Sequence, residues 1–218
     1  MNKVAVLHVE TPSSNMPMQR DLVNKMIASV RKHVPDPYII QMTDMNTPGL
    51  EVEEVRRLEP FSPFFMSYRL KHLSLMRYQV LILDSDTLVL KDPTHVFDTP
   101  FDVCLTYRTK RIVSPNIGYT EDDPLMAFNT GVMFSRSQDF WKDAFRVCET
   151  LEDRHKYWYG DQIAVTKLAE SGKYNVAALP CAEWNYTPAT EDEDLSGKNI
   201  AHFKGKKKKQ WMLNHGPV

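Results

Sequence analysis

Two acidic residues follow a strongly apolar run near the middle of the chain. Residues 80–83 are Val-Leu-Ile-Leu, and Asp84, Ser85 and Asp86 come directly after them. An unbroken apolar run with a β-branched member is typical of a strand buried on both faces in a parallel sheet. The two carboxylates would then lie at the carboxyl edge of the sheet, where open α/β folds bind their ligands.

A pair of carboxylates at such an edge calls for a cation. Leaving both groups ionised and unpaired would cost roughly several kcal/mol. A hard divalent metal, bound through oxygen and shared with a substrate phosphate, would neutralise them. The simpler alternative is that Asp84 and Asp86 end the strand and begin a turn, as aspartate often does. The motif alone leaves both interpretations open.

The elements around this motif alternate between strand and helix patterns. Residues 3–9 have the pattern of a buried strand, and residues 19–33 place apolar side chains at helical spacing. A second strand is expected at residues 38–40, after which residues 43–63 are expected to be mainly loop. This strand–helix–strand order is typical of a nucleotide-binding α/β half.

The second part of the chain continues the alternation. Helices are expected at residues 64–77, from Ser137 onward and at 157–169, and strands at residues 102–107, 125–134, 176–179 and 199–203. Gly131 interrupts one of these strands, which indicates a bulge or the close approach of a ligand. Asp161 falls in the first turn of its helix, where the helix dipole favours a carboxylate, so a plain helix-start acid is the alternative to a functional role.

Composition limits the class of protein. The chain has 218 residues and a formal net charge of -1, which gives no global argument for binding nucleic acid. Its three cysteines are widely spaced, which argues against a disulfide framework or zinc site and for a reducing compartment. No window approaches the apolar length of a membrane span, and the N-terminal run lacks the pattern of a signal peptide. We therefore expect a soluble, cytoplasmic protein.

Five short motifs occur in an order that resembles one enzyme family. They are Ser-Tyr-Arg-Leu-Lys at 67–71, Leu-Asp-Ser-Asp at 83–86, Asn-Thr-Gly-Val-Met at 129–133, Gly-Asp-Gln at 160–162 and His-Phe-Lys-Gly at 202–205. This series resembles the retaining GT-A glycosyltransferases of the glycogenin and lipopolysaccharide galactosyltransferase group. The resemblance implies a single-domain α/β GT-A fold with a Rossmann-like nucleotide-binding half and a mixed central sheet flanked by helices.

The resemblance also implies a cofactor and a donor. Asp84, Asp86 and His202 would hold Mn²⁺ or Mg²⁺, and the donor would be a nucleotide-diphosphate sugar, usually a uridine diphosphate (UDP) sugar. Carboxylate and imidazole ligands completed by diphosphate oxygens suit Mn²⁺ chemically. The metal would neutralise charge on the leaving diphosphate as a Lewis acid.

Further residues match positions around the donor in that family. The residues expected to bind the donor are Arg69, Ser85, Gly205, Lys206 and Lys208. Asn129, Asp161 and Gln162 are expected around the sugar and its anomeric carbon, where Asp161 or Gln162 would stabilise positive charge in the transition state. The family's Lys-Pro-Trp ending is replaced by Lys-Lys-Gln-Trp at residues 208–211, one residue out of phase.

The expected organisation is one domain over residues 1–218. Residues 1–105 would form the donor half, and residues 106–218 the acceptor side with the C-terminal metal- and phosphate-binding segment. The expected reaction is transfer of the sugar to a hydroxyl acceptor with retention of configuration.

Three alternatives remain at this stage. A non-catalytic nucleotide-sugar binding module would keep the same residues. A phosphohydrolase of the haloacid dehalogenase type also uses Asp-x-Asp after a strand, although Leu88 stands where that pattern has Thr or Val. The lysine run at residues 204–209 raises a polyanionic acceptor, such as DNA with hydroxylated bases, against the simpler interpretation of a phosphate clamp with solvated lysines.

Overall fold

The computed structural model describes residues 1–10, 16–59, 64–112, 126–157 and 159–216. Its helices are α1 (Met16–His33), α2 (Phe65–Leu73), α3 (Gln138–Glu149), α4 (Asp153–Lys156), α5 (Gly160–Glu170), α6 (Cys181–Trp184) and α7 (Lys206–Asn214), with a 3₁₀ turn η1 (Thr94–Asp98). Its strands are β1 (Asn2–Leu7), β2 (Pro37–Thr43), β3 (Glu54–Arg57), β4 (Val80–Leu83), β5 (Thr87–Val89), β6 (Val103–Ile112), β7 (Met126–Ser135), β8 (Val176–Pro180) and β9 (Ile200–His202).

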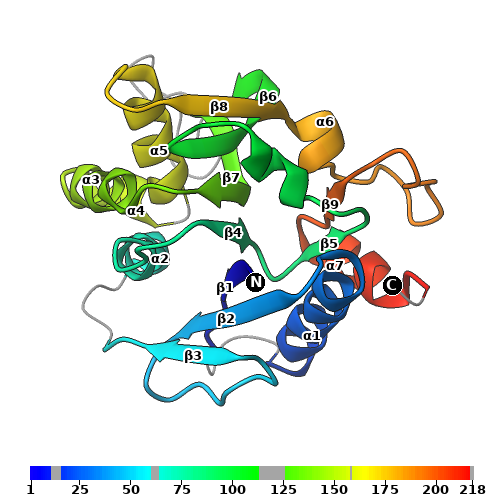
Figure 1. The fold of residues 1–218 in the computed structure, drawn as a ribbon. Helices are drawn as coiled ribbons and strands as arrows, with labels where there is room; N and C mark the ends of the chain where they lie inside the picture. Colours follow the sequence, from blue (N-terminus) through cyan, green and yellow to red (C-terminus); the bar gives the residue numbers. More distant parts are fainter. Residues whose placement is uncertain (11–15, 60–63, 113–125, 158, 217–218) are drawn as a thin grey trace.

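A seven-stranded mixed sheet runs through the middle of the molecule in the order β3-β2-β1-β4-β7-β6-β8 (Figure 1). Strands β3, β2, β1 and β4 are parallel, β7 is antiparallel to both β4 and β6, and β8 is parallel to β6. The strand before the two aspartates therefore has a parallel neighbour on one side only. The predicted α/β fold with a mixed sheet is confirmed.

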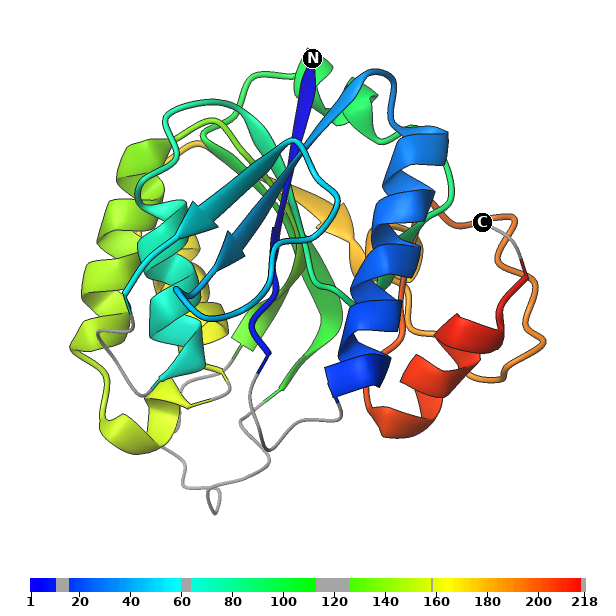
Figure 2. The same ribbon diagram turned by 90° about the horizontal axis from the view of Figure 1, so that it is seen from below.

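Helices cover both faces of this sheet. Helices α1 and α7 lie on one face, and α2, α3 and α5 lie on the other (Figure 2). Two apolar cores therefore form, one on each face of the sheet. The four residues of β4 are buried and alternate between the cores, with Leu81 and Leu83 in the first and Val80 and Ile82 in the second. This alternation explains the unbroken apolar run, because both faces of the strand pack against side chains.

The apolar run after the aspartates does not belong to the same sheet as β4, the strand before them. Residues Thr87–Val89 leave the main sheet as β5 and pair with β9 in a separate two-stranded sheet, with Thr87 opposite His202. This small pairing joins the segment after the Asp-Ser-Asp turn to a strand more than a hundred residues later in the chain. It is the element that brings the C-terminal segment to the carboxyl edge of β4.

Most of the predicted elements are present with shifted ends. The stretch at residues 43–63, expected to be mainly loop, contains the short edge strand β3, and the lysine run forms the start of α7. The Asn129–Met133 segment contains the expected irregularity, since the β6–β7 register shifts between Leu105 and Thr106. Residue 105, the expected limit of the donor half, lies inside β6, and the division into halves stays a prediction.

Within the described residues, no helix combines the length and apolar character needed to cross a lipid bilayer.

Candidate active site

Asp84, Asp86 and His202 meet at the carboxyl edge of β4. One potential ligand atom from each lies within 4.8 Å of the others. The His202 Nε2 atom is 3.0 Å from a carboxylate oxygen of Asp86 and 3.5 Å from one of Asp84. Two carboxylates and one imidazole, turned toward a common point, are a ligand set that suits Mn²⁺ or another divalent cation.

Backbone contacts fix His202 beside the aspartates. Its N–H donates to the carbonyl of Tyr186 at 2.6 Å, and the N–H of Phe203 donates to the carbonyl of Asp86 at 2.8 Å. The imidazole lies against Gly131, where a Cβ atom would come within 2.3 Å of the ring. The close approach at this glycine, expected from a bound ligand, is made instead by the His202 side chain.

A buried amide determines which His202 nitrogen faces the acids. Gly131 N–H donates to Asn129 Oδ1 at 3.0 Å, which identifies that atom as the side-chain oxygen. The same oxygen faces the Asn185 amide. Asn185 Nδ2 donates to Asn129 Oδ1 and to Thr106 Oγ1, both at 2.7 Å. Its Oδ1 must then accept from His202 Nδ1–H, at 2.7 Å, which leaves Nε2 for a metal.

This arrangement predicts that Asn185→Ala lowers Mn²⁺ affinity. Loss of such an outer partner of a metal ligand typically costs about 10–100-fold in affinity. Isothermal titration of the folded variant with MnCl₂ would measure the change. Asn214→Ala serves as the control, since Asn214 is exposed at the end of α7. Wild-type Mn²⁺ affinity in a folded Asn185→Ala protein would contradict the assignment.

Arg69 of α2 links the candidate metal site (Asp84, Asp86 and His202) to α5. Its guanidinium contacts Asp84 Oδ1 at 2.9 Å and Asp161 Oδ2 at 3.1 Å, and it donates to the Thr130 carbonyl at 2.9 Å. The Arg69 and Asp161 side chains are only 4% and 1% exposed, so this ion pair is shielded from water. The residue expected to reach the donor thus already holds two acids of the site in place.

Asp161 and Gln162 lie in the first turn of helix α5, on the other side of Arg69. Asp161 accepts from Thr130 Oγ1 and from its neighbour's backbone N–H, both at 2.8 Å. Burial raises the pKa of Asp161, against the opposing effect of Arg69. Gln162 Oε1 accepts from Arg108 Nη2, which joins the start of α5 to β6.

Lys209, which the sequence analysis did not single out, is the lysine that contacts the candidate metal ligands. Lys209 Nζ lies 3.2 Å from Asp86 Oδ2. Burial alone would raise the pKa of Asp86, but His202 and Lys209 hold it well below its usual range. Lys206 is exposed, and Lys208 lies over the Trp211 ring. Lys209 stands two residues before Trp211, as the lysine of Lys-Pro-Trp would, so that spacing was the available signal.

The remaining expected residues differ in how near they lie to this cluster. Ser85 lies half-buried between the two aspartates, and Asn129 is buried with its oxygen turned inward. Gly205 has φ of +86°, a conformation that L side chains rarely adopt, and it is the N-cap residue directly before α7. Among the residues that sequence reasoning missed, Asn185 and Lys209 directly contact the candidate metal ligands His202 and Asp86.

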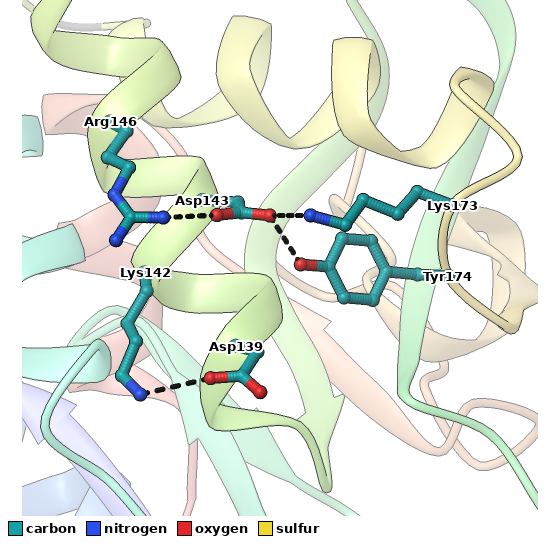
Figure 3. Close-up of a pocket in the computed structure, with 6 residues that line it drawn as sticks. All are labelled: Asp139, Lys142, Asp143, Arg146, Lys173 and Tyr174. Atoms are coloured by element: carbon teal, nitrogen blue, oxygen red, sulfur yellow. Dashed lines mark hydrogen bonds and ion pairs between the residues drawn. The ribbon is translucent and has the colours of Figure 1, made fainter.

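A surface pocket elsewhere has a different character. It lies on α3 and the segment before β8, and Figure 3 shows it lined by Asp139, Lys142, Asp143, Arg146, Lys173 and Tyr174. Asp143 is already paired with Arg146 at 2.9 Å and bonded by the Tyr174 hydroxyl at 2.6 Å. The exposed acids and bases of this pocket are useful as controls for those of the buried site.

Solved structures share this fold over nearly the whole chain. The bifunctional glycosyltransferase WbbM aligns with a TM-score of 0.65 at 14% identity over 99% of this chain and 50% of its own. A glycosyltransferase involved in glycosylation of the major capsid of PBCV-1 has a TM-score of 0.61 at 12% identity, covering 99% of each chain. GlyE of Streptococcus pneumoniae TIGR4 has a TM-score of 0.58 at 14% identity, covering 98% of this chain and 63% of its own.

The fold and its carboxyl-edge cluster define a GT-A-like glycosyltransferase architecture. The nucleotide-diphospho-sugar transferase family model matches residues 63–211, which contain all five motifs, and the chain belongs to this family. It spans half of the WbbM chain, and no curated protein sequence matches it. The predicted enzyme class, glycosyltransferase, is confirmed.

Proposed function

We propose that the protein transfers a sugar from a UDP-sugar to a hydroxyl acceptor, with retention of configuration, and that it depends on Mn²⁺ or Mg²⁺. The observation that carries this proposal is the convergence of Asp84, Asp86 and His202 within 4.8 Å, in a chain of the nucleotide-diphospho-sugar transferase family. The choice of UDP and of retention rests on the resemblance to the glycogenin and lipopolysaccharide galactosyltransferase group.

The metal would be held by Asp84, Asp86 and His202 Nε2. When bound, it supplies Lewis-acid stabilisation of charge on the leaving diphosphate. Lys209 lies beside Asp86, at a position from which its ammonium can bind a phosphate oxygen as a point charge. We assign Lys206, Lys208, Ser85 and the Gly205 backbone supporting roles around the same diphosphate.

The sugar would lie on the side of α5. There Gln162 and Asn129 offer amide groups to sugar hydroxyls, and the negative charge of Asp161 favours a positively charged transition state. Both carboxylate oxygens of Asp161 are occupied by Arg69, Thr130 and the Gln162 backbone, so we assign it an electrostatic role and name no nucleophile.

We also propose the donor half at residues 1–105, the acceptor side at 106–218 and a cytoplasmic location. The three cysteines support the location, because all are free thiols, as expected in a reducing compartment. The acceptor is proposed only as a hydroxyl compound.

Thermal unfolding with a panel of nucleoside diphosphates and their sugars, with and without Mn²⁺, tests the proposal. UDP compounds are expected to raise the melting temperature only when Mn²⁺ is present, because ligands of the folded state stabilise it by mass action. A bound UDP-sugar that is neither hydrolysed nor transferred would favour the alternative of a non-catalytic binding module. No response to any nucleotide would contradict the proposed function.

A further inference from the structure

Two basic side chains at the candidate site have no acidic partner of their own among the residues that the structure describes. The first is Arg108 of β6, which is half-buried. Its Nη1 donates to the Phe128 carbonyl and its Nη2 donates to Gln162 Oε1, both uncharged acceptors. Within the described residues, no carboxylate lies at ion-pair distance from Arg108. Burial is the main cause that lowers the pKa of its guanidinium.

The second is Lys204, which follows β9 two residues after His202. Its backbone N–H donates to the His202 carbonyl at 3.1 Å, and the charges of Arg108, Asp84 and Asp86 lie near enough to act on its ammonium. Burial is the main cause that lowers its pKa, and Arg108 adds to the effect. In the described part of the chain, its ammonium makes no hydrogen bond or ion pair.

The ionisable groups of the site within the described residues leave a positive excess. Among the described residues, three carboxylates lie near four basic side chains, and they are Asp84, Asp86 and Asp161 against Arg69, Arg108, Lys204 and Lys209. A divalent metal and the diphosphate of a bound donor have equal and opposite charges, so they do not change this balance. Because an unpaired buried charge is costly, one further anion would stabilise the loaded site.

The position of these two cations indicates where that anion would bind. Arg108 is tied to Gln162 on the sugar side of the site, and Lys204 lies near the metal-binding acids. Arg108 and Lys204 both act to lower the pKa of the Cys181 thiol, so the two basic groups lie near the same side chain. Arginine has further N–H donors after these two bonds and suits planar, bidentate contacts to carboxylate or phosphate.

We propose that Arg108 and Lys204 form an anion-binding subsite for a carboxylate or phosphate group carried by the transferred sugar or by the acceptor. This inference rests on the proposed function and narrows its substrate class. A neutral hexose with a neutral acceptor would leave the excess charge unpaired, whereas a hexuronic acid or a sugar phosphate would pair it.

Two binding measurements distinguish the sources of the anion. In the first, UDP-glucuronate and UDP-glucose are titrated into the Mn²⁺-loaded protein. In the second, the protein is saturated with Mn²⁺ and UDP, or with whichever nucleoside diphosphate binds, and glucuronate, glucose 6-phosphate and glucose are compared. The anionic probe is expected to bind about tenfold or more tightly than its neutral counterpart in at least one measurement, as charge-assisted hydrogen bonds allow.

Variants assign the preference to these residues. Lys204→Gln and Arg108→Gln are each expected to remove most of it while the nucleoside diphosphate still binds. Lys207→Gln is the matched control, because Lys207 is exposed and lies over Trp211, and it should keep the preference. Lys204→Gln decides the case if Arg108→Gln fails to fold, since Arg108 bridges β6, β7 and α5.

The outcomes separate this inference from the proposed function. Equal affinity for anionic and neutral probes in both measurements, or a preference that survives Lys204→Gln, overturns the subsite and leaves the transferase assignment intact. Failure of every nucleoside diphosphate to bind with Mn²⁺ overturns the proposed function and this inference together.

Discussion

Replacing Asp86 with asparagine is expected to abolish metal-dependent turnover of the donor while the protein stays folded. Asp86 is buried beside His202 at 3.0 Å and Lys209 at 3.2 Å. Its carboxylate is therefore less exposed to water than that of Asp84. The loss should exceed the roughly 10–100-fold effect of removing an outer partner, because a ligand itself is changed. Asparagine keeps the shape and adds no buried charge, so the fold should tolerate it.

Titration with MnCl₂ and a donor-turnover assay would measure both effects. Asp139→Asn is the matched control, since Asp139 is 78% exposed on α3 and pairs only with the neighbouring Lys142 among the described residues (Figure 3). Its metal affinity and turnover should equal those of the wild type. Turnover that persists in Asp86→Asn after chelation would rule out the proposed metal site.

The sequence predicted the part of the site that depends on local pattern. The apolar run before Asp84 identified the buried strand, because both of its faces pack. Gly131 was recognised as a close-approach position, but only the structure shows that the His202 ring occupies the space. His202 itself came from family resemblance, since nothing local indicates that residue 202 pairs opposite Thr87.

The missed residues depend on contacts between distant segments. Asn185 lies in an aromatic stretch and gains its role from amides and hydroxyls on β6 and β7 and from His202. Lys209 rather than Lys208 reaches Asp86 because α7 begins at residue 206 and sets the direction of each lysine. Periodicity determines which side chains share a face of one element, but not which partner faces them.

Replacing Arg69 with methionine is expected to destabilise the folded protein by about 3–5 kcal/mol, the usual cost of breaking a buried ion pair from one side. Arg69 is the shared partner of Asp84 and Asp161, at 2.9 Å and 3.1 Å. Without it, Asp161 would be a carboxylate 1% exposed with only neutral hydrogen-bond donors among its described partners. Urea unfolding at neutral pH would measure the loss.

Arg146→Met is the matched control for this measurement. Arg146 pairs with Asp143 at 2.9 Å, but its side chain is 75% exposed (Figure 3), so the loss should stay within about 1 kcal/mol. An equal effect of the two substitutions would contradict the importance assigned to the buried bridge.

A double-mutant cycle with Asp161→Asn then tests the physical cause. If the cost of Arg69→Met comes from an uncompensated Asp161 carboxylate, removing that charge should recover part of it. The double variant is expected to be more stable than the sum of the two single effects by about 1 kcal/mol or more, as contacting residues in one network allow. Strict additivity would mean that the two side chains stabilise the fold independently. A measured coupling would instead establish that the Arg69 guanidinium, which also contacts the proposed metal ligand Asp84, stabilises the fold by neutralising Asp161 at the start of α5.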